Sequence, residues 1–319
     1  FLTHLGHLTL PTPSIHALRK AAPDAHITML VDEKLKDVVL FNPYLDEVVT
    51  IDKKGRDNSI LSLWACSRHL SKLDFDVVIN LHPNERCSFI DAMTSVKLRT
   101  GTTHKIFKWF WDVFTPLDRS MHAADMYLDV LQQLGVQDLS NNGLEIFPGE
   151  EHFLEAELFW QEQNITDQDK LIGFNIGSAV PTKRWPPERF AEVADIFAAK
   201  GYKTVFFGGP MDEEMVAEAT GYMQTRPIIA TGHFAIGGLA AAMRRCCLII
   251  TNDSGPMHVA ISQKVPIVAM YGPSNPKLYG PYTKAAVIVT AQPPCQGCAD
   301  GMKHSCDDLQ CMSRMTVEQ

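Results

Sequence analysis

In residues 248–273 of the sequence, several side chains that could bind or react with a ligand lie at the start of an expected helix. A β-branched apolar run opens it and has the composition of a buried strand. A polar turn follows, and Pro256 just inside the expected helix is typical of a helix N-terminus. Backbone N–H groups at such an end attract phosphate. The stretch therefore predicts an anion site formed by Ser254 and Gly255.

The same stretch predicts one crossover unit of a parallel sheet. A second apolar run, residues 266–271, follows the helix and ends in Gly272-Pro273. A strand–turn–helix–strand order places the turn at the carboxyl ends of the strands, where open α/β sheets bind ligands. Two structural alternatives stay open here: Asp253 is only a helix cap, and His258 is a satisfied histidine of the core.

Length and composition indicate a two-domain globular protein. The chain has 319 residues, of which 45% are hydrophobic and 21% charged. A net charge of −8 argues against a nucleic-acid partner, which normally meets a basic surface. No apolar run approaches the roughly 20 residues of a membrane-spanning helix. The sequence starts at Phe1 rather than Met, and a helix is expected to begin at Thr316, so we expect that both ends are trimmed.

The first half alternates strands and helices, which predicts a doubly wound parallel sheet. We expect the tail of a first strand at 1–5, then Gly6-His7 in a loop. Further strands are expected at 27–31, 48–51, 77–80 and 96–100, and helices at 14–20, 60–70, 86–93 and 123–134. Turn signals between residues 138 and 169 mark the seam, which gives domains 1–150 and 151–319.

The second half repeats this alternation. Strands are expected at 171–176, 203–207, 248–251 and 266–271, and helices at 151–161, 187–200, 212–223, 236–244 and from 256. The loop after the first of these strands carries Gly177-Ser178 and then Lys183-Arg184-Trp185. Two such domains with a cleft between them suit a nucleotide-linked substrate.

These motifs in order resemble glycosyltransferase family 9, the ADP-heptose:lipopolysaccharide heptosyltransferases. The resemblance covers nearly the whole chain and is carried by Gly177-Ser178 with Lys183-Arg184-Trp185-Pro186, Gly208-Gly209-Pro210 with Asp212-Glu213, and residues 252–258, with weaker support from 6–19 and 122–135. It implies the α/β GT-B fold, two Rossmann-like doubly wound domains facing a cleft. The first domain would bind the acceptor, and the second would bind the nucleotide-sugar donor.

The resemblance also implies donor-binding residues. Without a divalent metal in this fold type, protein cations and helix N-termini must stabilise the departing diphosphate. Lys183 is the expected cation, Ser178 and Ser254 are hydroxyl donors, and the amides at Ser254 and Gly255 hold phosphate. Asp253 would repel phosphate, so we expect it to accept hydrogen bonds from sugar hydroxyls. By family position Glu213 contacts the nucleoside and His258 completes the donor motif; the alternatives are a solvated loop lysine at 183 and a helix-dipole carboxylate at 213.

The first loop departs from the family pattern. The family normally shows Gly-Asp, the Asp being the proposed base for the acceptor hydroxyl, whereas this chain has Gly6-His7. A neutral imidazole also accepts a proton near neutral pH. We therefore expect His7 to be the catalytic base, beside Lys183 as the second catalytic residue. The alternatives are weakened catalysis, a role in orienting the acceptor, or a histidine that only fills a turn.

An acceptor-side surface is expected at residues 104–114, where Lys105 and Lys108 are interleaved with aromatic residues. Lysines meet phosphates and aromatic rings lie at the level of lipid headgroups. The family's acceptors are lipid-linked, so the resemblance implies a cytoplasmic enzyme in peripheral contact with the inner membrane. The structural alternative makes Ile106, Phe107, Phe110 and Trp111 ordinary core and leaves Trp109 and the two lysines outside.

The cysteines fall into two groups. Four of them are expected to be small buried hydrophobes: Cys66, Cys87, Cys246 and Cys247. The other four, Cys295, Cys298, Cys306 and Cys311, lie close together with His304. Their spacing fits a structural zinc, free thiols or disulfides, and we expect no catalytic metal and no cofactor.

Two function classes remain. The first is an inverting glycosyltransferase that moves a sugar, heptose from ADP-heptose by resemblance, onto a lipopolysaccharide-core or other glycan acceptor. The second is a nucleotide-sugar-binding or epimerising GT-B protein, for which His7 in place of the expected Asp is the main argument.

Overall fold

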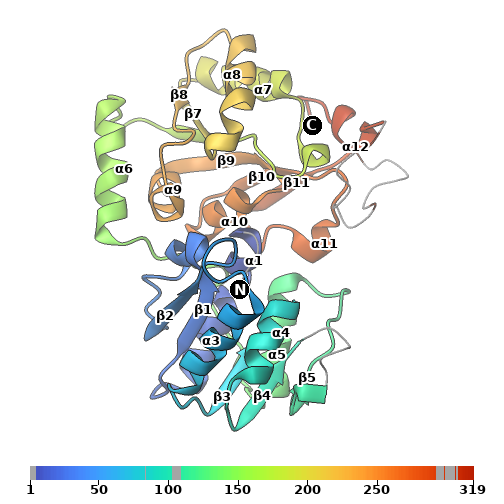
Figure 1. Cartoon of the computed structure of the whole chain (residues 1–319). Coiled ribbons are helices and arrows are strands. Elements are labelled where there is room, and N and C mark those ends of the chain that lie inside the picture. The colour runs from blue at the N-terminus through green and yellow to red at the C-terminus, as the bar shows by residue number, and fades with distance from the viewer. Residues whose placement is uncertain (1–4, 83, 103–108, 292–297, 299–305, 307) are drawn as a thin grey trace. The chain divides into compact units, whose positions relative to one another are not determined.

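The computed structural model describes residues 5–82, 84–102, 109–291, 298, 306 and 308–319, apart from the side chain of His7. The chain divides into two compact units, Phe1–Asn142 and Gly143–Gln319, which Figure 1 shows in blue to green and in green to red. Each unit is an α/β structure whose paired strands are all parallel.

Unit 1 contains two parallel sheets. The two-stranded sheet has the order β1-β2 and the three-stranded sheet the order β3-β4-β5. The elements are α1 Leu5–Thr9, α2 Thr12–Ala21, β1 Thr28–Asp32, the 3₁₀ helix η1 Glu33–Val38, β2 Glu47–Ile51, α3 Ile60–Ser71, β3 Val77–Asn80, α4 Glu85–Met93, β4 Leu98–Gly101, β5 Val113–Phe114 and α5 Ala123–Gln133.

Helix starts in unit 1 follow from local capping. Ser59 Oγ accepts a hydrogen bond from the Ser62 N–H at 3.1 Å, and Asn84 Oδ1 accepts one from the Cys87 N–H at 2.8 Å. The start of the chain differs from expectation, because Leu5 opens helix α1 instead of ending a strand. Residues 1–4 lie outside the described residues.

Unit 2 is built on one six-stranded sheet of order β11-β10-β9-β6-β7-β8. Its elements are α6 Glu150–Glu162, β6 Leu171–Asn175, η3 Pro181–Lys183, α7 Pro187–Ala199, β7 Lys203–Phe207, η4 Pro210–Asp212, α8 Glu213–Tyr222, β8 Ile228–Ile229, α9 Ile236–Met243, β9 Cys246–Asn252, α10 Gly255–Ser262, β10 Ile267–Met270, α11 Pro276–Tyr279, β11 Ala286–Val289 and α12 Gln310–Ser313. The expected helix at Thr316 is not formed, and the Thr316 N–H instead donates to Gln319 Oε1 at 3.1 Å.

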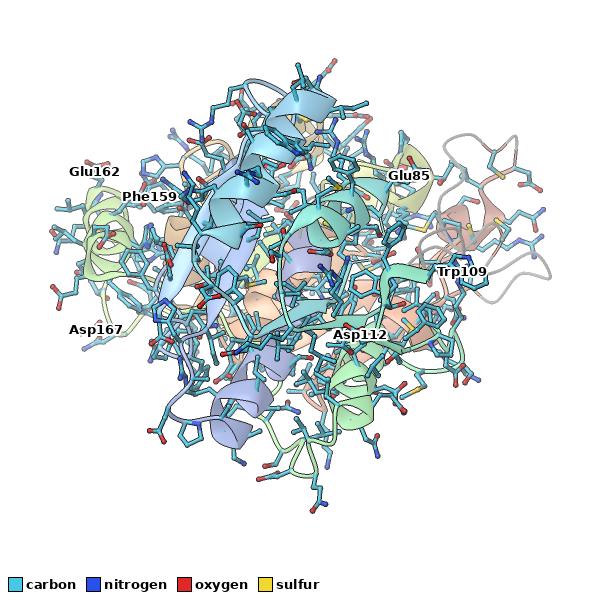
Figure 2. The ribbon with its side chains drawn as sticks, turned by 60° about the horizontal axis from the view of Figure 1, so that its bottom comes forward. Glu85, Trp109, Asp112, Phe159, Glu162 and Asp167 are labelled. Carbon is cyan, nitrogen blue, oxygen red and sulfur yellow. The ribbon has the colours of Figure 1, made fainter. Side chains whose placement is uncertain are left out.

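The core of unit 2 lies against the central strands. Every residue of β6 is buried, as expected for a parallel strand covered on both faces. The rings of Phe174 and Phe206 stack with centroids 5.1 Å apart, and Trp185 packs edge-on against Phe190. Helix α6 packs on α9, and Phe159, labelled in Figure 2, contacts His233 and Phe234 there. These contacts fix the strands whose carboxyl ends carry the candidate site.

Candidate active site

The candidate site lies where the sheet of unit 2 changes direction. From β6 the chain proceeds to β7 and β8 on one side, and it then returns to β9 on the other side. The loops after β6 and β9 therefore lead to opposite sides of the sheet, and such a switch point is where open α/β sheets bind ligands. Ser178 in the first loop and Asp253 in the second meet here, with Ser178 Oγ 3.5 Å from the Asp253 carbonyl oxygen.

A buried ion pair joins these two loops. Lys183 Nζ lies 2.7 Å from Asp253 Oδ2, and their side chains are only 15% and 7% exposed. Ser274, in the loop after β10, donates its hydroxyl to the same carboxylate oxygen. The idea of a solvated loop lysine is therefore wrong. The helix-cap alternative for Asp253 is also wrong, because Ser254 is the N-cap residue of α10 and the Asp253 carboxylate is bound by Lys183 and Ser274.

The N-terminus of α10 is shaped as an anion site. Ser254 has extended backbone angles and Pro256 occupies the first turn, as the sequence predicts. No side chain among the described residues caps this end. Ser254 Oγ instead accepts a hydrogen bond from Asn175 Nδ2 at 2.9 Å, which ties the start of α10 to the end of β6. The first N–H groups of a helix have no intrahelical partners, so the start of α10, which closely follows β9, is able to bind an anion.

His258 and Tyr271 lie behind this helix start. His258 is 4% exposed, so it belongs to the packing of α10. The Tyr271 hydroxyl donates to the Tyr279 carbonyl oxygen at 2.9 Å. Burial, together with the nearby charge of Asp253, raises the pKa of Tyr271 well above its ordinary value, so this hydroxyl stays protonated.

Asn252 clamps the loop that carries the lysine. Its Oδ1 accepts a hydrogen bond from the Trp185 N–H at 3.0 Å, and its Nδ2 donates to the Ile176 carbonyl oxygen at 2.7 Å. Asn252 is fully buried. Arg184 adds a second link, since its Nε donates to the Ser178 carbonyl oxygen at 2.8 Å. The main chain on both sides of Lys183 is therefore tied to the ends of β6 and β9.

The segment after α12 braces the same loop. The Trp185 indole N–H donates to the Met315 carbonyl oxygen at 3.1 Å, and the Arg189 guanidinium donates to the same oxygen. Met312 packs against Gly272, at the end of β10, where an added Cβ would collide with its sulfur. The loops after β6 and β10 are thus supported by one short segment.

A third group lies at the ends of β6 and β7. Asp212 accepts a hydrogen bond from the Gly209 N–H at 2.9 Å. A Cβ at Gly177 would collide with the Asp212 carboxylate, so glycine at this position makes room for the Asp212 side chain between the two loops. Glu213 begins α8 and is exposed, with Oε1 2.8 Å from the position of a Cβ at Gly232.

Unit 1 holds the expected acceptor-side residues. Gly6 and His7 lie in α1 instead of a loop, so the expectation of a turn there is wrong. The His7 side chain, Lys105 and Lys108 lie outside what the structure describes. Trp109 is 84% exposed and Phe110 is 53% exposed, whereas Trp111 is buried. Figure 2 shows Trp109 and Asp112 in this segment, which continues into β5. The core alternative therefore holds for Trp111 and fails for Phe110.

The cysteines differ partly from expectation. Cys87 and Cys246 are buried, Cys66 is half-buried, and Cys247 is exposed because it lies on the other face of β9 from Cys246. Cys311 is buried in the core of unit 2. Cys295 and His304 lie outside the described residues. Within the part of the chain that the structure describes, no three His, Cys, Asp or Glu side chains are placed to hold a metal ion.

Sequence reasoning did not select Asn175, Asn252 and Ser274 as site residues. Asn252 stands in the predicted turn next to Asp253 and at the start of the 252–258 motif, but no role was assigned to it. Ser274 follows the Gly272-Pro273 turn after the next strand. Because carboxyl ends of neighbouring parallel strands meet at one edge, these positions were accessible to prediction once the strand order was known.

Comparisons with known proteins agree with the family resemblance that the sequence motifs carry. The model of glycosyltransferase family 9 (heptosyltransferase) matches residues 63–306. A glycosyl transferase family 9 structure from Veillonella parvula DSM 2008 is 53% identical, covers 100% of this chain and 93% of its own, and has a TM-score of 0.95. The ADP-heptose lipopolysaccharide heptosyltransferase II of Escherichia coli has a TM-score of 0.77 at 20% identity, with 99% and 93% covered, which shows the fold alone.

A curated relative extends the likeness along the sequence. Lipopolysaccharide heptosyltransferase 3 of Escherichia coli strain K12 is 24% identical over 294 residues, which are 88% of this chain and 83% of the relative. Among the described residues, no helix combines the length and the apolar character needed to cross a membrane.

Proposed function

The chain belongs to glycosyltransferase family 9 and is a glycosyltransferase with the GT-B fold, and we propose from this premise that it is an inverting enzyme that transfers heptose from ADP-heptose to a lipopolysaccharide-core acceptor. The donor and the acceptor are those in the names of its relatives. Unit 2 binds the donor and unit 1 the acceptor. The observation that supports the proposal most directly is the buried Lys183–Asp253 ion pair at the switch point of unit 2.

Lys183 and Asp253 bind different parts of a nucleotide-diphosphate sugar. One N–H of the Lys183 ammonium is used by Asp253, and the others are available to oxygens of the diphosphate. The N–H groups at the start of α10 bind the same phosphates, assisted by the hydroxyls of Ser178 and Ser254. Asp253, itself held by Ser274 and Lys183, accepts hydrogen bonds from sugar hydroxyls with its remaining lone pairs.

The reaction follows from this arrangement. The acceptor hydroxyl attacks C1 of the sugar from the face opposite the diphosphate, and the bond between C1 and the phosphate oxygen breaks. The configuration at C1 is inverted. Negative charge develops on the departing diphosphate, where Lys183 and the positive end of α10 stabilise it without a divalent metal. His7 takes the proton of the acceptor hydroxyl, and Glu213 contacts the nucleoside.

A donor panel tests the proposal. Purified protein is incubated with ADP-heptose, ADP-glucose, UDP-glucose or UDP-N-acetylglucosamine, with and without a heptose-deficient lipopolysaccharide acceptor and with excess EDTA. We expect release of ADP from ADP-heptose that depends on the acceptor and persists in EDTA. Epimerised nucleotide-sugar without transfer would instead support the second function class, and transfer lost in EDTA would contradict metal independence.

The site of peripheral membrane contact is part of the proposal. The acceptor is embedded in a membrane, so unit 1 must approach the lipid surface. The exposed Trp109 and its sequence neighbours Lys105 and Lys108 provide an aromatic and basic segment suited to anionic headgroups.

A further inference from the structure

Asn175 is a buried polar residue where β6 ends, next to the candidate site. It is 1% exposed and is paired in register with Thr251 of β9. Its Nδ2 lies 3.2 Å from Thr251 Oγ1 and 2.9 Å from Oγ of Ser254, the N-cap residue of α10. One amide group thus contacts both the end of β9 and the start of the helix that follows it.

The hydrogen bond of the Thr251 hydroxyl determines which way round the Asn175 amide lies. Thr251 Oγ1 donates its single proton to the Asn252 carbonyl oxygen at 2.8 Å, and a carbonyl group cannot donate in return. Toward Asn175 the threonine oxygen can therefore only accept. The amide nitrogen, which is the donor, must face Thr251, because the reversed amide would set two acceptors against each other.

The same nitrogen faces Ser254, so the serine oxygen also accepts a hydrogen bond from Asn175. Within the part of the chain that the structure describes, Ser254 Oγ makes no second hydrogen bond, and it does not cap its own helix. Ser254 is half-buried, so a ligand can reach it. Because Asn175 occupies one of its lone pairs, the hydroxyl directs its proton away from the amide and keeps it for a ligand that accepts.

We propose that Asn175 is a positioning residue for the transfer reaction: its amide makes the Ser254 hydroxyl a fixed hydrogen-bond donor to the diphosphate. This role rests on the proposed function. The start of α10 and the Lys183 ammonium are positive groups of the site and favour an anionic oxygen there. As the bond between C1 and the phosphate oxygen breaks, charge grows on the diphosphate. The bond from Ser254 then strengthens, and the hydroxyl does not have to turn first.

The other end of the amide distinguishes this role from a purely structural one. Among the described residues, Asn175 Oδ1 is buried without a hydrogen-bond partner. An unpaired buried oxygen lowers stability, and a leucine side chain of similar size would have no such oxygen. The amide thus contributes less to the fold than an apolar residue could, whereas its N–H groups set the direction of the Ser254 hydroxyl.

Asn175→Asp tests the direction of this hydrogen bond, because it replaces the donor by an acceptor of the same size. In this variant Ser254 must donate to the new carboxylate, and its proton is withdrawn from the diphosphate. The added negative charge also opposes diphosphate binding, so the same change is made in Ser254→Ala, where only the charge acts. Assays are run at pH 8.5, more than four units above the ordinary aspartate pKa of about 3.9.

The decisive quantity is the difference between the two backgrounds. kcat with ADP-heptose is measured for the wild type, Asn175→Asp, Ser254→Ala and the double variant, with folding checked by circular dichroism. We expect Asn175→Asp to lower kcat at least tenfold more in the presence of Ser254 than in Ser254→Ala. Equal reductions in both backgrounds would overturn the proposal, because Asn175 would then act without the Ser254 hydroxyl.

Asn175→Leu distinguishes orientation of the hydroxyl from a simple tether on α10. Leucine removes the donor but leaves Ser254 free to turn its proton to the diphosphate in some of its staggered positions. We therefore expect kcat to fall several-fold, clearly less than in Asn175→Asp. Thr204→Val, which removes a buried hydroxyl from β7, is the control and should keep kcat. A loss in Asn175→Leu as large as in Asn175→Asp would overturn the proposal in favour of the tether.

Calorimetry with ADP separates the two levels of inference, since ADP binding needs neither the sugar nor the acceptor. Wild-type protein without measurable affinity for ADP would overturn both the proposed function and the role of Asn175. Binding of ADP without transfer from ADP-heptose would overturn the proposed function alone. The affinities of the same four proteins for ADP then test Asn175, with the same larger loss expected in the presence of Ser254 and equal losses against it.

Discussion

Asn252 and Trp185 are joined by a hydrogen bond between the Asn252 Oδ1 and the Trp185 backbone N–H, 3.0 Å long and fully buried. Through it, a side chain at the end of β9 fixes the main chain two residues after Lys183. Replacing Asn252 by Ala leaves this N–H and the Ile176 carbonyl oxygen without a protein partner. An unsatisfied buried group costs about 1–3 kcal/mol. Two such groups are left, so we expect a loss of roughly 2–6 kcal/mol in unfolding free energy in urea, together with a lower kcat.

If Asn252 had only a structural role, its replacement would lower the stability but leave the kcat of the molecules that remain folded unchanged. For Asn252→Ala we expect kcat per folded molecule to fall at least tenfold at a temperature where circular dichroism shows full folding. Gln163→Ala, an exposed position at the end of α6, is the control. Normal kcat in folded Asn252→Ala would show that the clamp does not position Lys183.

Lys183→Ala tests the charge at the leaving group. Losing one group that stabilises the developing charge costs roughly 3 kcal/mol in the barrier, so kcat should fall by about two orders of magnitude. Lys203→Ala at the exposed start of β7 is the matched control. Turnover near the wild-type value with saturable donor would dismiss this role.

The variant Asp253→Ala tests whether this carboxylate binds the sugar or the nucleotide of the donor. If the carboxylate addresses the sugar, calorimetry should show a larger loss of affinity for ADP-heptose than for ADP. ADP binding is expected to be kept or strengthened, because Lys183 loses its competing carboxylate. Equal losses for both ligands would mean that Asp253 only supports the fold.

Asp91 makes the stability of unit 1 depend on pH. Burial raises its pKa to about 7, against the opposing effect of the Asn80 side-chain hydrogen bond. Between about pH 4 and pH 7 the folded state therefore holds a proton that the unfolded state releases. The stabilisation is present below the unfolded pKa and is lost as the pH rises through 7. Urea midpoints should fall over this range, and Asp91→Asn, which keeps an acceptor for Asn80, should flatten that decline.

Membrane contact is tested by replacing Lys105, Lys108 and Trp109 together with Ser. Sedimentation with vesicles that contain phosphatidylglycerol should be abolished, and the apparent Km for a lipid acceptor should rise while donor affinity is unchanged. Trp64→Ser, at a half-exposed position of α3, controls for the loss of a surface tryptophan. Unchanged vesicle binding in low salt, where electrostatic attraction is strongest, would contradict the idea.

The sequence predicted the alternation of strands and helices well, because buried parallel strands and amphipathic helices carry strong periodic signals. Short edge strands were missed: β8 has two residues, and β11 is half-exposed at Val287. Such strands carry no pattern that separates them from loops. Gly6 and His7 were placed in a loop after an expected strand, yet both lie in the short helix α1, in which Leu8 is fully buried.

The sequence indicated which types of residue form the candidate site, but not which of these residues contact one another. Lys183 and Asp253 were selected separately, one as a cation for phosphate and the other as an acceptor for sugar. Their ion pair joins residues 70 positions apart, and only the strand order brings these positions together. The role of Asn252 as a clamp could not be predicted from the sequence, because its two partners are main-chain groups that no sequence pattern identifies.

The bond from the Trp185 indole to the Met315 carbonyl has a consequence for synthesis on the ribosome. The two residues are 130 positions apart. At about 5–20 residues per second, roughly 7–26 seconds separate the synthesis of one from that of the other. During that interval the sheet of unit 2 can pair its strands, but the lysine-bearing loop lacks its brace. In a nascent chain the strands of unit 2 can therefore pair before the hydrogen bond from Trp185 to Met315 forms.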